Sequence, residues 1–291
     1  MTISATPGPG TGGQRAERRG ARVAVPPGPH TDCLADHDGA ITFTFAVDDD
    51  APRWDAVLLQ RRGGDQLADV VDLPLERAGS GRLRAVLAPT TRLPEGRWDV
   101  YVAGDGPPRR LRPGVDDLRT LVDRRPDPAA SDVRVRIPYP TKYRNLSLRA
   151  WERGPHAEAE RVRVGPEGTT LVGRLYGAEL TGDACLEARA RGGTGEPLRF
   201  PVAGRGRCFT VPLPCAELAA CREEGADTAV WDLWLRPGGD AAPARIARLL
   251  DDVYDKSGVI RYPPLALPTA AATPLFTADN DLALQVRWAA A

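Results

Sequence analysis

Short runs in which apolar and polar residues alternate recur along the chain, and one run occurs twice. Residues 97–102 read RWDVYV and residues 230–235 read VWDLWL, with an apolar side chain at every second position. Strict alternation over this length is typical of a β-strand with one buried face. The tryptophan of each run, Trp98 or Trp231, falls on the apolar face, so we expect it to pack in a core. The opposite face carries Asp99 with Tyr101 in the first run and Asp232 with Trp234 in the second.

This correspondence extends over most of the chain. A shift of 128 residues places the alternating segment 39–47 on 167–175, and segment 54–62 falls on 182–190. An acidic residue next to a glycine, a dipeptide typical of hairpin turns, stands at the start of both of the first two matched segments. Matched landmarks in one order predict that the chain holds two copies of one module. The closing motif of the two copies is Thr141-x-x-x-Asn145-Leu146-x-Leu148 and Thr277-x-x-x-Asp281-Leu282-x-Leu284.

Each copy is predicted to be an antiparallel β-sandwich with one short helix. About seven strands of five to eight residues, separated by Gly, Pro and Asp, suit an immunoglobulin-like sandwich of this size. Apolar residues at helical spacing predict a helix near 118–122 in the first copy and over 246–253 in the second. Pro243 would stand near the start of the second helix, where its missing N–H costs little. The fold class expected from the sequence is all-β, with two tandem immunoglobulin-like antiparallel β-sandwiches.

Four segments follow from this division. Residues 1–33 are rich in Gly, Pro, Thr and Arg without any hydrophobic period, which predicts a disordered N-terminal tail. The first sandwich is expected over residues 34–152 and the second over residues 161–291. Between them, residues 153–160 are polar and include a proline, which is typical of a hinge.

Composition narrows the partners and the compartment. The chain of 291 residues has 39 basic and 39 acidic residues, so its net charge does not favour nucleic acid. No apolar stretch suits a signal peptide or a membrane span, so we expect a cytoplasmic protein. Five cysteines without a C-x-x-C pair or a neighbouring histidine disfavour zinc and favour free thiols. A disulfide among Cys208, Cys215 and Cys221 is left open.

Motifs for catalysis and cofactor binding are missing from the sequence. The three histidines, His30, His37 and His156, fall in the expected tail, a turn and the hinge, where no packed scaffold orients a general base. Residues 48–50 are aspartates but lack the spacing of a calcium loop. No glycine-rich loop has the lysine or the strand–helix context that binds phosphate. We therefore expect no catalytic residue, no metal and no cofactor.

Aromatic and basic residues supply the candidate ligand contacts. Tyr101 and Trp234 occupy equivalent positions opposite the core tryptophans, where they form a protein interface, a stacking platform for sugar rings, or a face that another element covers. In a binding module, aromatic rings contribute flat apolar area while Arg144 or Lys142 meets phosphate or carboxylate groups. A second cluster, present in the first copy alone, consists of Tyr139, Lys142, Tyr143 and Arg144.

The doubled pattern also resembles a known family. Both copies contain W-D-[LV]-[YW]-[LV], then a short Arg- and Leu-rich segment, then T-x-x-x-[ND]-L-x-L, which [PY]-x precedes in the first copy, and together they span residues 34–291. In this combination the chain resembles the β-sandwich repeats that accompany actinobacterial cell-surface glycopolymer transferases. Those repeats stand beside glycosyltransferase or glycerophosphotransferase domains of the teichoic-acid type. The resemblance implies repeats that recognise polymer or mediate oligomerisation while a separate domain performs the transfer. This sequence lacks such a domain, because no D-x-D in it follows a βαβ nucleotide-sugar pattern.

Three functions follow from these observations. The leading prediction is a non-catalytic accessory module that binds a cell-surface glycopolymer or its partner transferase. One alternative is an oligomerisation scaffold in which sheet edges or aromatic faces join identical subunits. The other is an enzyme, with glycosyl or glycerophosphate transfer implied by association alone. No nucleic acid and no membrane span are expected.

Overall fold

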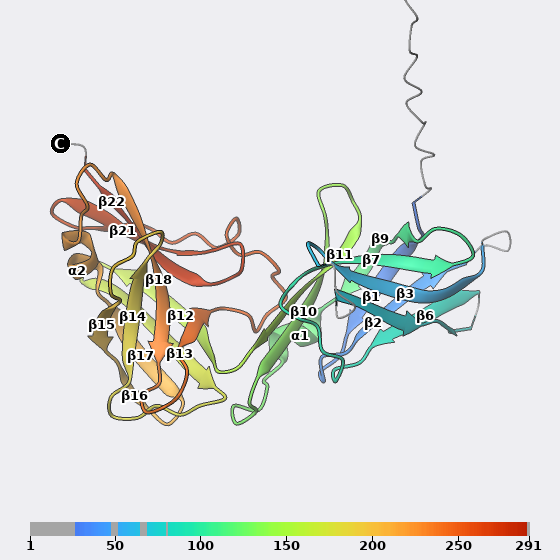
Figure 1. The fold of residues 1–291 in the computed structure, drawn as a ribbon, viewed down its shortest axis with the longest axis horizontal. Coiled ribbons are helices and arrows are strands. Elements are labelled where there is room, and N and C mark those ends of the chain that lie inside the picture. The colour runs from blue at the N-terminus through green and yellow to red at the C-terminus, as the bar shows by residue number, and fades with distance from the viewer. Residues whose placement is uncertain (1–26, 48–51, 65–68, 80, 290–291) are drawn as a thin grey trace, which may run out of the picture.

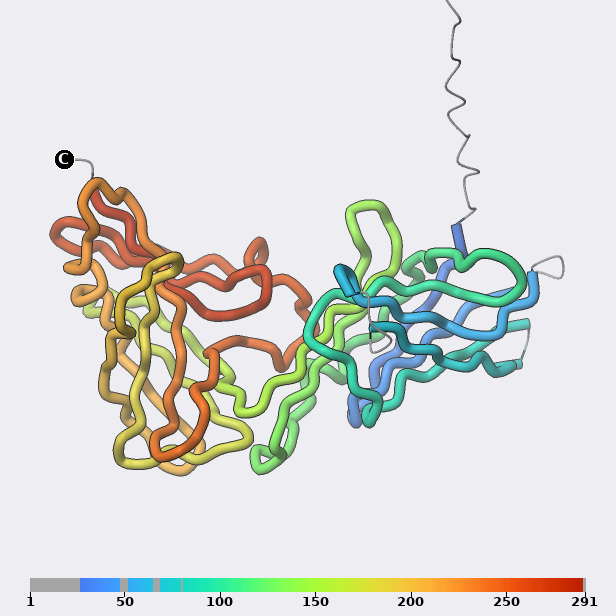
Figure 2. The backbone as a smooth tube through the Cα atoms, viewed as in Figure 1, coloured from blue at the N-terminus to red at the C-terminus, as the bar shows by residue number. Residues whose placement is uncertain are grey.

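The computed structural model describes residues 27–47, 52–64, 69–79 and 81–289 and is built mainly from β-strands. Figures 1 and 2 show two lobes, the first coloured blue to green and the second yellow to red. The all-β fold class is confirmed. Residues 1–26, most of the expected tail, lie outside the described residues. Strand β1 (His30–Ala35) begins inside the segment that we expected as tail, so the first sandwich starts earlier than predicted.

The first lobe is a sandwich of two sheets. Its elements are β1, β2 (Ile41–Ala46), β3 (Trp54–Arg61), β4 (Val70–Pro74), β5 (Glu76–Arg77), β6 (Arg82–Leu87), β7 (Gly96–Gly104), β8 (Arg109–Arg110), β9 (Arg112–Asp117), α1 (Arg119–Asp123), β10 (Val133–Pro140) and β11 (Leu146–Arg153). One sheet has the order β5-β6-β2-β1-β9. The other has the order β10-β11-β7-β3-β4, with β8 paired to β7.

The second lobe has the corresponding strands. Its elements are β12 (His156–Gly165), β13 (Gly168–Tyr176), β14 (Cys185–Ala190), β15 (Leu198–Pro201), β16 (Ala203–Arg205), β17 (Cys208–Leu213), α2 (Cys215–Ala220), β18 (Thr228–Arg236), β19 (Ala244–Ala247), β20 (Leu265–Ala266), β21 (Ala270–Phe276) and β22 (Leu282–Trp288). The main path runs β16-β17-β13-β12-β19-β18-β22-β21-β20, and β14 joins β15 to β18.

Strand pairing repeats between the lobes. In the first lobe β1 pairs with β2 antiparallel and with β9 parallel, and in the second β12 pairs with β13 antiparallel and with β19 parallel. The other sheets also match, as β4-β3-β7-β11-β10 and β15-β14-β18-β22-β21. After β7 the chain changes sheets through the separate strands β8 and β9, whereas β19 alone pairs with both β18 and β12. The predicted duplication is therefore present in the topology.

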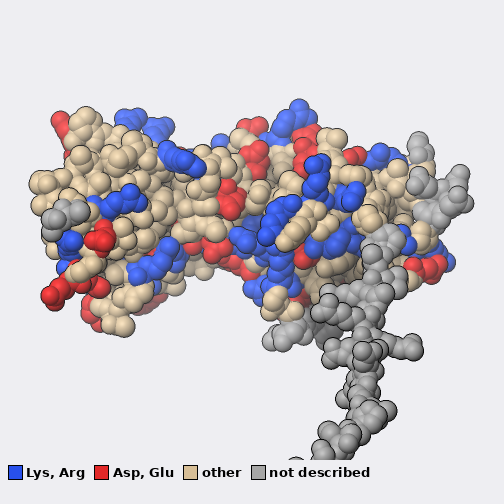
Figure 3. Space-filling model, turned by 90° about the horizontal axis from the view of Figure 1, so that it is seen from above, with Lys and Arg blue, Asp and Glu red and all other residues tan. Residues whose placement is uncertain are grey.

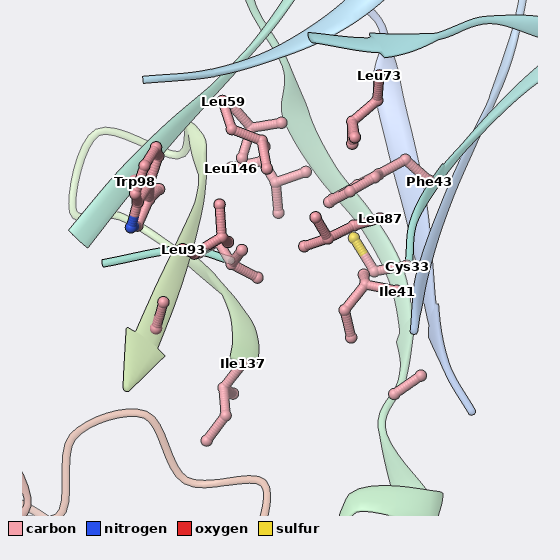
Figure 4. Close-up of a cluster of buried hydrophobic side chains, with 14 of the residues drawn as sticks. Cys33, Ile41, Phe43, Leu59, Leu73, Leu87, Leu93, Trp98, Ile137 and Leu146 are labelled. Carbon is pink, nitrogen blue, oxygen red and sulfur yellow. The ribbon is translucent and has the colours of Figure 1, made fainter. Parts of the chain in front are cut away.

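Each lobe has its own core between its two sheets. Figure 4 shows Phe43 on one sheet of the first lobe facing Leu59 and Trp98 on the other. Trp98 is fully buried, and its counterpart Trp231 in the second core is 7% exposed, as the alternating pattern predicted. Because successive strand residues point to opposite faces, a period of two places one apolar set in each core. Burial of that set, at about 25 cal/mol per Å² of apolar surface, is the main force that holds the sheets together.

The outer face of the β10–β11 hairpin joins the two lobes. Val135, Ile137 and Trp151 project from this face and are buried. Ala247 and Leu249 of the second lobe belong to the same core cluster. The cluster therefore continues from the first sandwich across the junction, and Figure 1 shows the hairpin lying beside the second lobe.

Polar contacts fix the same junction. The indole Nε1 of Trp151 donates to the carbonyl oxygen of Asp279 at 3.0 Å, and Arg149 Nη2 lies 2.6 Å from the carboxylate of Asp279. A backbone bond from Gly177 N to Pro128 O adds a third link. The junction thus combines apolar burial with hydrogen bonds at defined positions.

The segment predicted as a polar hinge is mostly strand. Gly154 and Pro155 alone separate β11 from β12, and the first four residues of β12 are buried. Burial of a charged group is tolerated there because Glu158 lies 2.7 Å from Nε2 of His156 and accepts backbone N–H groups after β19. The expectation of a polar linker over 153–160 is wrong in this respect, and the division into two domains stays a proposal.

The helix predicted over 246–253 does not form. Residues 244–247 are strand β19, preceded by Pro243, and the chain beyond it is irregular. The apolar residues of this segment have helical spacing for another reason. Ile246 lies in the second core, whereas Leu249 packs with the first. The helix predicted near 118–122 is present as α1, and the second lobe has its helix α2 between β17 and β18. Among the described residues, no helix has the length and apolar character needed to cross a bilayer.

Candidate functional site

Trp234 lies on the outer face of the second lobe, on the opposite side of β18 from the core residue Trp231. Two guanidinium groups flank its ring, with Cζ of Arg189 at 4.3 Å and Cζ of Arg245 at 5.3 Å from the centroid. Strand pairing places them there, because Arg245 is opposite Trp234 on β19 and Arg189 lies diagonally on β14. The ring quadrupole attracts such cations. The half-buried indole is therefore held between two arginines.

A buried glutamate anchors the arginines on this face. Glu187 is opposite Trp234 across β14 and β18 and is fully buried. It accepts hydrogen bonds from Arg189 Nη2 at 2.7 Å, Arg236 Nε at 2.8 Å and Arg199 Nε at 3.1 Å. Burial alone would raise the pKa of Glu187, but the three bonds outweigh it and lower the pKa to about 2. Glu187 therefore stays ionised at neutral pH and orients three guanidinium groups.

A second carboxylate extends the network toward the junction. Asp232 lies 2.5 Å from Arg191 Nη2 and 2.8 Å from Arg245 Nη2. Arg245 also contacts Asp281 at 3.1 Å, and Arg153 of the first lobe contacts the other oxygen of Asp281 at 2.5 Å. Five arginines of the second lobe thus contact three carboxylates, an excess of two positive charges. This surface, named the Trp234 face, consists of Trp234, Arg189, Arg191, Arg199, Arg236 and Arg245.

The first lobe has a smaller version, named the Tyr101 face, which consists of Tyr101, Arg62 and Arg110. Tyr101 occupies the position of the tryptophan, and Cζ of Arg110 lies 5.0 Å from its ring centroid. Asp99 accepts from Arg62 Nε at 2.8 Å and from Ser147 Oγ at 2.9 Å, and Arg110 Nη1 lies 2.8 Å from its second oxygen. An Asp-anchored pair of arginines beside an aromatic ring is therefore common to both lobes.

The two faces differ in their second anchor. Leu58 is opposite Tyr101, at the position that Glu187 occupies opposite Trp234. Among the described residues of the first lobe, no buried glutamate consequently gathers further arginines around the Tyr101 ring. Figure 3 shows blue side chains gathered on the first lobe near the junction, interspersed with red ones.

The hairpin cluster predicted in the first lobe is divided by the structure. Tyr139 is 6% exposed and stacks on Tyr254, with 4.1 Å between ring centroids, so it is not free to meet a ligand. Lys142, Tyr143 and Arg144 form the exposed turn between β10 and β11. Tyr143 is 74% exposed, and Nζ of Lys142 lies 4.9 Å from its ring centroid. The turn, not the strand, therefore presents the cluster to solvent.

Sequence reasoning identified the aromatic rings but not the arginines around them. It placed Tyr101 and Trp234 on outer faces, where the structure has them partly exposed. Arg110 and Arg245 were not recognised, because they come from short strands after a turn and meet the ring only through pairing with β7 and β18. A detectable signal was the arginine that directly follows each of the equivalent strands β3 and β14, Arg62 and Arg191.

Among the described residues, neither the cysteines nor the residue types that bind metals form a further candidate site. All five cysteines are free, including Cys208, Cys215 and Cys221, for which a disulfide had been left open. Burial raises the pKa of the Cys215 thiol, so it is a poor nucleophile. Within the described ranges no three His, Cys, Asp or Glu side chains are grouped as a metal site requires.

Comparisons with known proteins give no family. No protein-family model matches the chain, and no curated protein matches it. Among solved structures, a fragment of TarS from S. aureus covering its residues 217–571 is 9% identical, with 75% of this chain and 61% of that chain covered and a TM-score of 0.28. A pullulanase from Anoxybacillus sp. LM18-11 complexed with maltotriose is 14% identical over 78% of this chain and 26% of its own, with a TM-score of 0.24. A titin fragment, A168–A169, is 12% identical over 75% of this chain and 95% of its own, with a TM-score of 0.20.

Proposed function

We propose that this protein is a non-catalytic module that binds an anionic cell-surface glycopolymer, chiefly through the Trp234 face. The observation that carries the proposal is the group of five arginines around a partly exposed tryptophan, with fewer carboxylates than guanidinium groups. The Tyr101 face and the turn at Lys142, Tyr143 and Arg144 provide a second, weaker contact.

The charge of the Trp234 face suits phosphate or carboxylate groups. Arg189, Arg191 and Arg199 have side chains that are 37%, 47% and 58% exposed, so their unused N–H groups reach solvent. A guanidinium group binds such anions through two parallel hydrogen bonds. Because Glu187 and Asp232 already hold the arginines in place, binding loses less side-chain entropy than it would with free arginines.

The aromatic ring favours a glycan over a bare polyanion. Trp234 is partly exposed at the centre of the positive face, so the part of its indole that Arg189 and Arg245 leave open can contact the apolar side of a sugar ring whose charged substituents meet arginines. A purely electrostatic site needs no ring at that position. The combination therefore supports a polymer in which sugar or polyol units alternate with anionic groups.

A partner transferase is the finer part of the proposal. The structural neighbour TarS is a teichoic-acid glycosyltransferase. Since that chain is matched over 61% of its length at a TM-score of 0.28, we base the proposal on the residues of this chain. The repeat motifs described from the sequence supply the expectation that such modules act beside an enzyme that extends or decorates the polymer.

Titration calorimetry with purified wall teichoic acid tests the proposal. We expect saturable binding that weakens with added salt, because exposed charge pairs are screened. Trp234→Ala should weaken binding about 30-fold, the loss of about 2 kcal/mol typical of a central aromatic contact. Arg163→Ala is the matched control, since Arg163 is an exposed arginine on β12, outside both faces, and should leave affinity unchanged.

Two outcomes contradict the proposal. One is equal affinity for dextran, a neutral polymer, since this removes the role of the arginines. The other is unchanged affinity in the Trp234→Ala protein. Light scattering on the same samples addresses the scaffold alternative, because a mass that grows with concentration in the absence of polymer favours subunit association.

A further inference from the structure

A hollow lies between the two lobes, beside the end of helix α1. It has a volume of about 300 Å³, the size at which ligand pockets usually begin. Val122 and Arg125 line it from the first lobe, and the second lobe supplies residues of β12, the end of β13 and the segment after β19. The hollow has no residue in common with the Trp234 face, so an inference about it does not rest on the function proposed above.

Tyr176, the last residue of β13, brings an unpaired hydroxyl group to this hollow. Tyr176 is 3% exposed, and its hydroxyl has no hydrogen-bond partner in the described part of the chain. Unlike the indole N–H of Trp231, this hydroxyl is not sealed from water. It lies within electrostatic reach of Arg125, Glu158 and Glu160, which line the same hollow. Buried polar groups nearly always have a partner, which makes the Tyr176 hydroxyl a candidate ligand contact.

Two arginines, one from each lobe, supply further unused donors. Arg125 is exposed, and its Nη1 donates to the carbonyls of Val122 and Arg124, whereas its Nε and Nη2 have no partner among the described residues. Nε of Arg248 donates to Asp251 at 3.1 Å, which leaves both Nη groups of Arg248 available. A phenol and two guanidinium groups around one hollow therefore have donors that the described chain does not use.

The carboxylates around the hollow already have partners. Both oxygens of Glu158 accept from backbone N–H groups, and Oε2 also lies 2.7 Å from Nε2 of His156. The other carboxylates are in ion pairs, which are Arg248–Asp251 at 3.1 Å, Lys256–Asp251 at 2.6 Å and Arg174–Glu160 at 3.0 Å. Arg125 is thus a fourth cation against three carboxylates, with His156 counted as neutral. This balance favours an anionic ligand.

We propose that this hollow binds a small phosphate monoester, whose phosphate group accepts hydrogen bonds from Tyr176, Arg125 and Arg248. A phosphate monoester has three strong acceptor oxygens and up to about two negative charges at neutral pH, which suits three donor groups better than a carboxylate does. Val122 and Leu250 offer apolar contacts to its organic part. Burial raises the pKa of the Tyr176 hydroxyl, so the hydroxyl keeps its proton and can donate at neutral pH.

Nuclear magnetic resonance of the isotope-labelled full chain tests the assignment with ethyl phosphate as the probe. Ethanol is the control without the phosphate, and propionate carries a carboxylate on the same ethyl group. We expect saturable shifts of the amide signals of Ala159 and Leu250, which line the hollow, with ethyl phosphate and none with ethanol. Propionate should bind about tenfold more weakly, because it accepts fewer charge-assisted hydrogen bonds. These signals report on the hollow alone, so this proposal and that for the Trp234 face can fail separately.

Substitutions make the test specific. Tyr176→Phe keeps the buried ring and removes the hydroxyl, so the Kd for ethyl phosphate should rise about 30-fold, as expected for one hydrogen bond to a charged group. Arg125→Gln removes a guanidinium group from an exposed position and should raise the Kd by a similar factor. Tyr254→Phe is the matched control. Tyr254 stacks on Tyr139 at the same junction but does not line the hollow, so the Kd should stay unchanged.

The contrary results are equally definite. The assignment is overturned if ethyl phosphate leaves the Ala159 and Leu250 signals unmoved, if ethanol shifts them as strongly, or if propionate binds as tightly. An unchanged Kd in the Tyr176→Phe protein overturns it as well. Circular dichroism checks that each variant is folded, and Arg125→Gln decides the matter if Tyr176→Phe is not.

Discussion

The β10–β11 hairpin of the first lobe and the β21–β22 hairpin of the second have the same pairing and the same turn, yet their outer faces have opposite roles. Counting from Thr141 and Thr277, Val135 and Trp151 correspond to Ala271 and Arg287. The first pair is buried at the junction, whereas Ala271 is half-buried and Arg287 is exposed. The fold therefore comes from residues that face each core, while residues one position away decide which surface joins lobes and which meets solvent.

The outer faces of β7 and β18 differ in a comparable way. Both lobes keep an aspartate that holds two arginines beside an aromatic ring. The second lobe adds Glu187 where the first has Leu58, and three arginines gather around that glutamate. One substitution on a β-strand thus separates a weakly charged face from a strongly charged one. The second lobe is the better candidate for binding anions for this reason.

The largest expected effect is at the junction. Trp151→Ala removes a buried indole that packs across the lobes and donates to Asp279, so the free energy of unfolding should fall by about 3–5 kcal/mol. Arg287→Ala, the same position in the other hairpin, should change it by less than about 0.5 kcal/mol. Urea unfolding followed by circular dichroism measures both, and equal effects would show that the two hairpin faces are equivalent.

The Glu187 anchor should have an intermediate effect. Glu187→Gln removes the charge that orients three partly exposed arginines, and we expect a loss of about 2 kcal/mol, less than for a fully buried pair because water reaches the guanidinium groups. Glu76→Gln, in the exposed pair with Arg84, should cost about 0.5 kcal/mol or less.

The effect of Glu187→Gln should also depend on pH. The folded-state pKa of Glu187 is about 2, below its ordinary value of 4.5, so the carboxylate contributes its full stability above about pH 4.5. That contribution is lost as pH falls toward 2, where the native protein and the variant should converge. Urea midpoints measured across this range give the answer, and a difference that persists unchanged in acid excludes the assigned pKa.

The smallest expected effect distinguishes the two hairpin turns. Arg144 and Asn280 occupy the same turn position with φ of 57° and 61°, a region that glycine adopts without steric cost. Arg144→Gly should stabilise the protein by about 0.5–1 kcal/mol, since Arg144 is exposed and its backbone is strained. Asn280→Gly should destabilise it by about 1–2 kcal/mol. The asparagine accepts from Lys256 N and donates to Val253 O, and both bonds are lost. Changes of the same sign in thermal unfolding would contradict this difference.

Alternation and internal repetition were sufficient to predict the all-β class, the doubled sandwich and the burial of Trp98 and Trp231. They failed where a residue is buried by the other lobe. Tyr139 was expected to meet ligand, but it stacks on Tyr254, which is distant in sequence. The residues after β19 have helical spacing because they divide between two cores. Pattern analysis assumes a single buried face for each segment, and that assumption fails at a junction.

The candidate site shows the same limit. Trp234 was found because it recurs beside the W-D motif. Nothing in the sequence of β14 distinguishes Glu187, whose role follows from the hydrogen bonds that it accepts from three arginines on different strands. Whether a loop carbonyl accepts the indole N–H of a core tryptophan, as Pro94 does for Trp98 and no described residue does for Trp231, is also not recorded by any spacing in the sequence.

Hydrogen–deuterium exchange of the full chain with and without wall teichoic acid tests the central claim most directly. If the Trp234 face binds the polymer, peptides from β14, β15, β18 and β19 should exchange more slowly in its presence, with a weaker effect at β7 and β8. Peptides from β21 should exchange at the same rate in both samples. Protection confined to β21 and β22, or no protection on either lobe, would contradict the account.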